Sequence, residues 1–198
     1  MRKRTITGAG AVLMRAAWLL LLVGVAASAP TTRAQAATPG EYQLKAAFLF
    51  NFAKFIDWPP ASFPGPQASF SICILGVDPF GHSMDELLQG KTIADRRVSI
   101  ERSKQVADVR HCQMVFVSSS EKSRVREILD GLRGTSVLVV GETDGFAAAG
   151  GAIQFAIEDN HVHFVINTDA AERAGLKVSS NLLSLAHVVH DGEKNDRS

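Results

Sequence analysis

The chain has 198 residues, 46% of them hydrophobic, and its 21 basic and 20 acidic side chains give a formal net charge of +1. This composition excludes a disordered chain, a collagen-like repeat and a disulfide-dense miniprotein. A chain of this length usually folds as one domain with a substantial core.

Residues 1–36 have the pattern of a cleavable signal peptide. Three bases near the start precede an apolar stretch from Ala16 to Ala27, and Ala34-Gln35-Ala36 offers small residues for cleavage. The apolar stretch is shorter than the ~20 residues that a membrane span needs, which argues against an uncleaved anchor. We therefore expect an exported protein with one mature domain over residues 37–198 and an ordered core over about 41–189.

The net charge of the whole chain differs from that of the mature domain, because the signal segment is basic. Residues 1–36 hold five bases and no acid, so their removal leaves 16 basic against 20 acidic side chains, a net charge of −4. Domains that bind nucleic acids normally carry a clustered basic face. We therefore expect no nucleic-acid partner.

The mature chain predicts helices that alternate with strands. Apolar residues at helical spacing predict a helix over residues 41–55, which ends before Pro59. The later elements are a strand over 69–76, a helix over 79–88, a strand over 97–101, a helical turn over 106–110, a strand over 114–118, a helix from a capping box at Ser118 to Gly134, a strand over 136–140, a hairpin over 152–166, a short helix to Arg173, and a last helix from Ser179 or Ser180 to about Val189. This order predicts a single-domain layered α/β sandwich with a mostly parallel sheet, an antiparallel hairpin at one edge and helices on both faces.

Cys73 and Cys112 are the two cysteines of the chain. In an oxidising compartment, paired thiols normally form disulfides, and the spacing excludes a CxxC redox motif. A bond between them would close a loop of about 40 residues and stabilise the fold by on the order of 4 kcal/mol. We expect a structural disulfide, with a metal site or a redox pair as the alternatives.

The first predicted helix and the residues after it carry the densest aromatic cluster, which comprises Phe48, Phe50, Phe52, Phe55 and Trp58. Phe50 lies off the apolar stripe that Leu44, Phe48 and Phe55 define. Aromatic rings on two faces of a helix are found both in cores and on dimer or partner surfaces. Both interpretations stay open, and the candidates for a partner or dimer surface are Phe48, Phe50, Phe52 and Trp58.

Motifs for dinucleotide binding, phosphate loops, nucleophile elbows and zinc proteases do not occur, so no catalytic residue and no cofactor is predicted. The run Ser118-Ser119-Ser120 favours helix capping over a nucleophile. His161 and His163 share a strand face near Asp159 and could chelate a metal. Histidines are common on exposed hairpins, so we favour an ordinary surface role.

Arg173 and Lys177 flank Gly175 in a loop between two helical segments that follow a strand. In α/β folds such loops often hold anions. The two side chains are therefore the candidate ligand-binding residues.

Several segments together resemble the YfiR-like family of bacterial periplasmic proteins. Besides the leader, they are the segment 42–59 that ends in Trp58-Pro59, the strand Ile72–Gly76, the strand after His111-Cys112, and the ending from Phe164 to Leu185. The resemblance covers essentially the whole mature chain.

The resemblance implies a non-enzymatic periplasmic regulator. The best-known members bind the periplasmic sensor domain of an inner-membrane diguanylate cyclase and hold it inactive, which lowers cyclic di-GMP and biofilm formation. An OmpA-like outer-membrane lipoprotein can sequester them. The resemblance also implies a homodimer, a stabilising Cys73–Cys112 disulfide and a small-ligand role for the loop of Arg173 and Lys177. Some members have a second cysteine pair near the hairpin, and this sequence has none there.

Two other functions compete with this one. The first is a periplasmic sensor that binds a small anion at Arg173 and Lys177. The second is a hydrolase that lacks familiar motifs.

Overall fold

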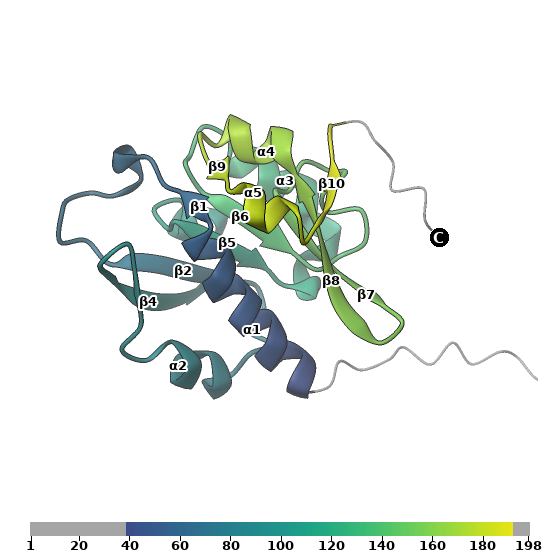
Figure 1. The fold of residues 1–198 in the computed structure, drawn as a ribbon, viewed down its shortest axis with the longest axis horizontal. Coiled ribbons are helices and arrows are strands. Elements are labelled where there is room, and N and C mark those ends of the chain that lie inside the picture. Colours follow the sequence, from purple (N-terminus) through teal and green to yellow (C-terminus); the bar gives the residue numbers. More distant parts are fainter. Residues whose placement is uncertain (1–38, 192–198) are drawn as a thin grey trace, which may run out of the picture. The chain divides into compact units, whose positions relative to one another are not determined.

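The computed structural model describes residues 39–191, so the predicted signal peptide lies outside the described residues (Figure 1). The helices are α1 (Pro39–Lys54), α2 (His82–Leu88), α3 (Val125–Gly131), α4 (Thr168–Arg173) and α5 (Ser180–Leu183), with 3₁₀ turns at Pro60–Ser62, Val106–Val109 and Ser119–Arg124. The strands are β1 (Ile56–Asp57), β2 (Phe70–Leu75), β3 (Thr92–Ile93), β4 (Arg96–Ser103), β5 (Met114–Val117), β6 (Leu138–Gly141), β7 (Ile153–Glu158), β8 (His161–Asn167), β9 (Lys177–Val178) and β10 (His187–Val189). Across residues 39–191, the helices are all too short or too polar to span a membrane.

The main sheet has the strand order β10-β8-β7-β6-β5-β2-β4-β3. The five neighbouring strands β7, β6, β5, β2 and β4 run parallel to one another. Strand β8 pairs antiparallel with β7, and β10 pairs parallel with β8. The predicted α/β class with a mostly parallel sheet and an antiparallel hairpin is confirmed.

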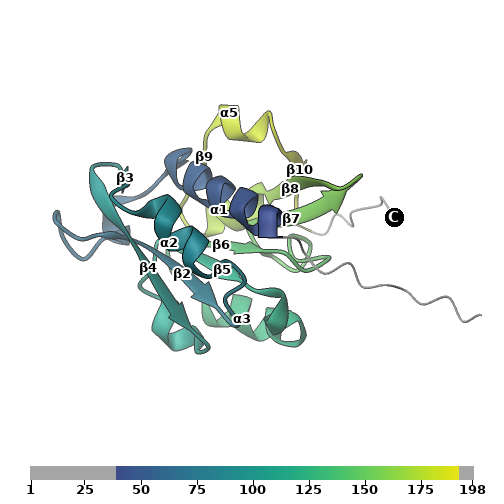
Figure 2. The same ribbon diagram turned by 90° about the horizontal axis from the view of Figure 1, so that it is seen from below.

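The pleat of the central strands divides the core between the two faces of the sheet. Successive side chains point to opposite faces, so Ile72 and Ile74 of β2 join one cluster while Cys73 and Leu75 join the other. Helices α1 and α2 cover the first face and α3 covers the second (Figure 2). Because both faces are covered, these strands read as continuous apolar runs in the sequence.

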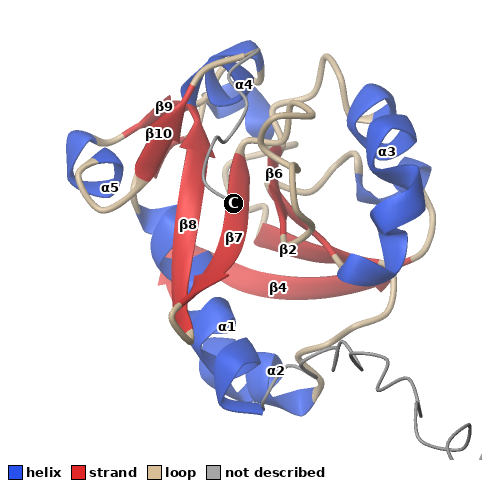
Figure 3. Ribbon diagram, turned by 90° about the vertical axis from the view of Figure 1, so that its right-hand side faces the viewer, coloured by secondary structure: helices blue, strands red, loops and turns tan. Residues whose placement is uncertain are grey.

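The predicted last helix is wrong in its second half. Only Ser180–Leu183 is helical, with the Ser179 hydroxyl accepting a hydrogen bond from the Leu182 amide. His187–Val189 instead forms β10, which pairs with Val165–Asn167. Two consecutive valines suit a strand, and the free side of β8 offers the backbone partners. The hairpin of β7 and β8 therefore lies one strand in from the edge of the sheet (Figure 3).

A second, two-stranded sheet fixes the end of α1. Ile56 and Asp57 of β1 pair antiparallel with Val178 and Lys177 of β9. The Ser179 amide also donates to the Phe55 carbonyl oxygen at 3.0 Å. These contacts connect the first helix directly to the C-terminal part of the described chain.

Candidate functional site

The aromatic cluster of α1 belongs largely to the core. Phe52 is fully buried, so its ring is not part of the exposed partner or dimer surface for which the sequence made it a candidate. Phe48 is half-buried, and its ring centroid lies 5.9 Å from that of Phe52 and 5.5 Å from that of Phe164 in β8. These rings therefore fasten α1 to the hairpin.

Trp58 and Phe50 are half-buried as well. The Trp58 indole donates a hydrogen bond to the Ala53 carbonyl oxygen at 2.9 Å, and its ring meets the Phe70 ring edge-on at 5.0 Å between centroids. The Lys54 ammonium group lies 5.4 Å from the Phe50 ring centroid. Both rings have partners within the chain and keep some exposed area.

The outer side of α1 carries exposed apolar side chains. Leu44 is 45% exposed and Phe55, one residue beyond the helix, is 38% exposed. At 3.6 residues per turn, Leu44, Phe48 and Phe55 point to the same side, and we call these three residues the α1 stripe. Leu44 and Phe55 are its exposed members, whereas the Phe48 ring packs on the hairpin. From their helical spacing alone, these three side chains would be expected to face the core. Apolar residues occur all around this helix, however, so the spacing does not determine which side is buried.

The inner side of α1 contributes a buried ion pair. The Lys45 ammonium group lies 2.6 Å from a Glu41 oxygen and 2.7 Å from a Glu142 oxygen, and the Lys45 and Glu142 side chains are each 4% exposed. Glu142 follows β6 and also accepts a hydrogen bond from the Ser119 amide after β5. In many α/β proteins this carboxyl edge of the sheet binds ligands, and here the Lys45 side chain lies there.

Tyr42 completes this polar group. Its hydroxyl donates to Glu142 at 3.4 Å. Burial, followed by the negative charge of Glu142, raises the pKa of Tyr42 to about 12. The phenol therefore stays protonated and holds α1 to the end of β6 at neutral pH.

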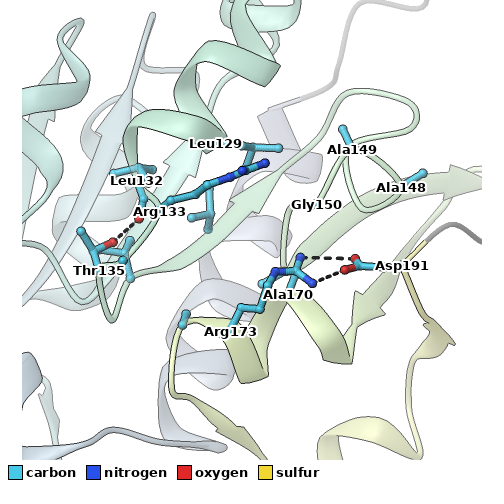
Figure 4. Close-up of a pocket in the computed structure, with 15 residues that line it drawn as sticks. Leu129, Leu132, Arg133, Thr135, Ala148, Ala149, Gly150, Ala170, Arg173 and Asp191 are labelled. Carbon is cyan, nitrogen blue, oxygen red and sulfur yellow. Dashed lines mark hydrogen bonds and ion pairs between the residues drawn. The ribbon is translucent and has the colours of Figure 1, made fainter.

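A cavity of about 580 Å³ opens between α3, the loop before β7 and α4 (Figure 4). Its polar lining includes Arg133, Arg173 and Asp191. One Arg173 nitrogen lies 3.3 Å from an Asp191 oxygen, and a second forms a closer contact with the other oxygen. Hydrogen bonds from Arg173 and then from Asn167 hold the pKa of Asp191 below its usual value. The Arg173 charge is therefore balanced inside the chain.

The structure does not bring the two predicted anion-binding residues together. Arg173 lines the cavity, whereas Lys177 lies in β9 opposite Asp57, outside the residues of that lining. Arg133 and Asp191 were not among the residues predicted from the sequence. They come from separate parts of the chain, and no local motif marks them.

The other polar candidates lie apart from this cavity. His161 and His163 are exposed on β8, and among the described residues neither belongs to a group of three or more metal-ligating side chains. The Ser118 hydroxyl accepts a hydrogen bond from the Ser120 amide and so caps the 3₁₀ turn that precedes α3. The capping role predicted for this serine run is confirmed.

The predicted disulfide between Cys73 and Cys112 is present. Their Cα atoms are 6.2 Å apart, and the bond joins β2 to the segment that leads into β5. Both cysteines are buried in the core cluster beneath α3. The disulfide thus fixes two neighbouring parallel strands beside each other.

These features define a single-domain α/β protein with an internal disulfide, an apolar stripe on its first helix and an arginine-lined cavity. The chain belongs to the YfiR/HmsC-like family, whose model matches residues 42–187. The resemblance found in the sequence is confirmed.

Two solved structures show weak likeness to the chain. The crystal structure of a conserved domain protein from Vibrio cholerae matches with a TM-score of 0.49 at 12% identity, over 74% of this chain and 59% of that one. The ABC domain in complex with L-Trp from Streptococcus pneumoniae matches with a TM-score of 0.43 at 12% identity, over 60% of this chain and 54% of that one. The chain thus spans little more than half the length of either protein.

Proposed function

We propose that this protein is a periplasmic, non-enzymatic regulator that represses an inner-membrane diguanylate cyclase by binding its periplasmic sensor domain. Membership of the YfiR/HmsC-like family supports the proposal. The observation that carries it is the α1 stripe, where Leu44 and Phe55 expose apolar area that residues 39–191 do not cover. The regulator also forms a homodimer, and an OmpA-like outer-membrane lipoprotein sequesters it.

Repression follows from a difference in affinity. A regulator that binds the inactive sensor conformation more tightly than the active one shifts the population towards the inactive enzyme. Complete burial of one leucine or phenylalanine side chain contributes about 1.5–3 kcal/mol. Burial of the α1 stripe shifts the population only to the extent that it is greater against the inactive conformation than against the active one.

The test replaces apolar area on the stripe without entering the core. We expect Leu44→Asp and Phe55→Asp to weaken binding to the purified sensor domain at least about tenfold. Each substitution loses apolar burial and also places an unpaired carboxylate in the contact, and together these costs exceed the roughly 1.4 kcal/mol that a factor of ten requires. Binding is measured by isothermal titration calorimetry. In a deletion strain, the same variants should fail to lower cyclic di-GMP.

The matched control is Val77→Asp, because Val77 is 59% exposed but follows β2 and lies outside the stripe. Far-ultraviolet circular dichroism checks the fold of all three variants, and light scattering reports whether the stripe mediates dimerisation. Parent-like affinity for the sensor domain in both stripe variants would remove the α1 stripe from the proposal. No rise of cyclic di-GMP on deletion would contradict the repressor function itself.

The cavity supports a second candidate, a periplasmic sensor of small anions. Arg133 and Arg173 lie beside the apolar walls of a cavity of about 580 Å³. Each guanidinium group is paired with a carboxylate of the chain, Asp130 and Asp191 respectively, so a bound anion would take the place of these carboxylates. A ligand that binds only the folded state raises the melting temperature. A carboxylate or nucleotide that stabilises the parent protein but not Arg133→Ala or Arg173→Ala would support this candidate. Equal stabilisation of parent and variants would place the ligand elsewhere.

A further inference from the structure

Four side chains with metal-ligating atoms meet at the outer end of the disulfide. Their ligand atoms all lie within 4.8 Å of one another, and they belong to Cys73, Glu101, His111 and Cys112. Cys73 and Glu101 are register partners on the parallel strands β2 and β4, so their side chains emerge on the same face of the sheet. His111 and Cys112 approach that face from the segment before β5.

The distances suit a closed metal site. The His111 Nε2 atom lies 3.1 Å from a Glu101 oxygen and 3.9 Å from the Cys112 sulfur. In a tetrahedral zinc site, bond lengths of about 2.0–2.3 Å place neighbouring ligand atoms roughly 3.3–3.8 Å apart. Once the bond between the two sulfurs is reduced, small rotations of these side chains would bring all four atoms to a common centre.

The position of the four groups also gives the site an inner and an outer side. The cysteines are buried, whereas the side chains of His111 and Glu101 are 60% and 45% exposed. A metal ion could therefore enter from solvent past the imidazole and the carboxylate. Two sulfurs, one imidazole and one carboxylate form a ligand set that zinc accepts.

We propose that the dithiol form of this protein binds one Zn²⁺ ion through Cys73, Glu101, His111 and Cys112. The disulfide form does not bind it, because sulfur atoms bonded to each other cannot act as thiolate ligands. Zinc binding and disulfide formation are thus mutually exclusive states of the same two cysteines. This proposal does not depend on the regulatory function proposed above.

The conversion between the two states balances as a thiol–disulfide exchange. A dithiol reductant gives two electrons and two protons to the Cys73–Cys112 bond and becomes a disulfide itself, which leaves two cysteine thiols. When Zn²⁺ binds, both thiols release their protons to solvent. The metal then replaces the covalent link between β2 and the segment before β5.

The test uses the full mature protein, reduced with dithiothreitol and freed of it under inert gas. Co²⁺ should give tetrahedral visible bands and a near-ultraviolet thiolate charge-transfer band, and one equivalent of Zn²⁺ should remove both. Zn²⁺ should also raise the melting temperature of the reduced protein and leave that of the oxidised protein unchanged. A reduced protein without the charge-transfer band would overturn the proposal.

Variants that keep both cysteines test the other two ligands. We expect His111→Ala and Glu101→Gln to weaken Zn²⁺ binding by the reduced protein at least about tenfold, measured by competition with a chromophoric chelator. The controls are His163→Ala and Glu158→Gln, which change exposed residues of the same types on the hairpin. Parent-like zinc affinity in either ligand variant would disprove the four-residue site.

Discussion

Tyr42 stabilises the folded state by an amount that decreases at alkaline pH. Its pKa is 10.0 in the unfolded chain and about 12 in the folded one, chiefly because of burial and then because of Glu142. The folded state thus holds the phenolic proton more tightly. The resulting stabilisation is complete below pH 10 and is lost as the pH rises towards 12.

We therefore expect the free energy of unfolding to fall more steeply between pH 10 and 12 in the parent protein than in Tyr42→Phe. The side chain is partly exposed, so solvent screening reduces the difference to on the order of 1 kcal/mol. Urea unfolding of both proteins at a series of pH values measures it. Identical slopes would show that Tyr42 does not titrate differently in the two states.

The disulfide between Cys73 and Cys112 stabilises the fold by restricting the unfolded chain. Their bond closes a loop with a sequence separation of 39 residues. We expect Cys73→Ala combined with Cys112→Ala to lower the free energy of unfolding by about 4 kcal/mol, because the open chain gains conformational entropy. Urea unfolding with metal chelated throughout gives the value, and an unchanged midpoint would refute this expectation.

Among the structural elements, the loop between β6 and β7 depends on two glycines. A Cβ atom at Gly141 or Gly151 would overlap the buried Phe146 ring, so the ring fits only against bare backbone. This explains why the last residue of β6, Gly141, and the loop residue Gly151 are glycines. The ring in turn joins the core cluster under α3.

We expect Gly151→Ala to destabilise the protein by about 1–3 kcal/mol, since the Phe146 ring must move within a packed core. The matched control is Gly65→Ala, where an added Cβ meets nothing within 4 Å. Its effect should stay within about 0.5 kcal/mol. Thermal unfolding of the two variants compares them, and equal melting temperatures would show that the ring relocates freely.

The predictability of each element depends on the strength of its local pattern. The sequence predicts the buried strands β2, β5 and β6 well, because a short apolar run bounded by glycines or turns is typical of a buried strand. It favours helix for β10, because these three residues become a strand only by pairing with β8. The exposure of Leu44 and Phe55 escapes prediction for a similar reason, since the sheet decides which side of α1 is covered.

At the scale of the whole molecule, the two core clusters make the centre of the sheet its most stable part. Every residue of β2, β5 and β6 is buried, whereas β10 exposes two of its three residues. We expect amide hydrogens of the three central strands to exchange slowest and those of β10 and of the hairpin tip to exchange fastest. Native-state hydrogen exchange measures this, and uniform protection across the sheet would contradict it.

The candidate sites are less predictable than the fold. The disulfide follows from composition and compartment, because two cysteines allow one pairing. The cavity joins Arg133, Arg173 and Asp191 from separate segments, and only the folded chain reveals that they meet. The same holds for Glu101, which reaches Cys73 through strand register, whereas His111 is the sequence neighbour of Cys112.

Some contacts of α1 involve residues far away in the sequence, and this affects the order in which contacts can form as the chain folds. Lys45 lies 97 residues from Glu142, and β1 pairs with β9 still further along the chain. A chain that is delivered N-terminus first therefore presents α1 long before Glu142 and β9 arrive. The cysteines, 39 residues apart, can meet much sooner. The first helix is thus the earliest element of the described domain to emerge, and its contacts with Glu142 and β9 are among the last that can form.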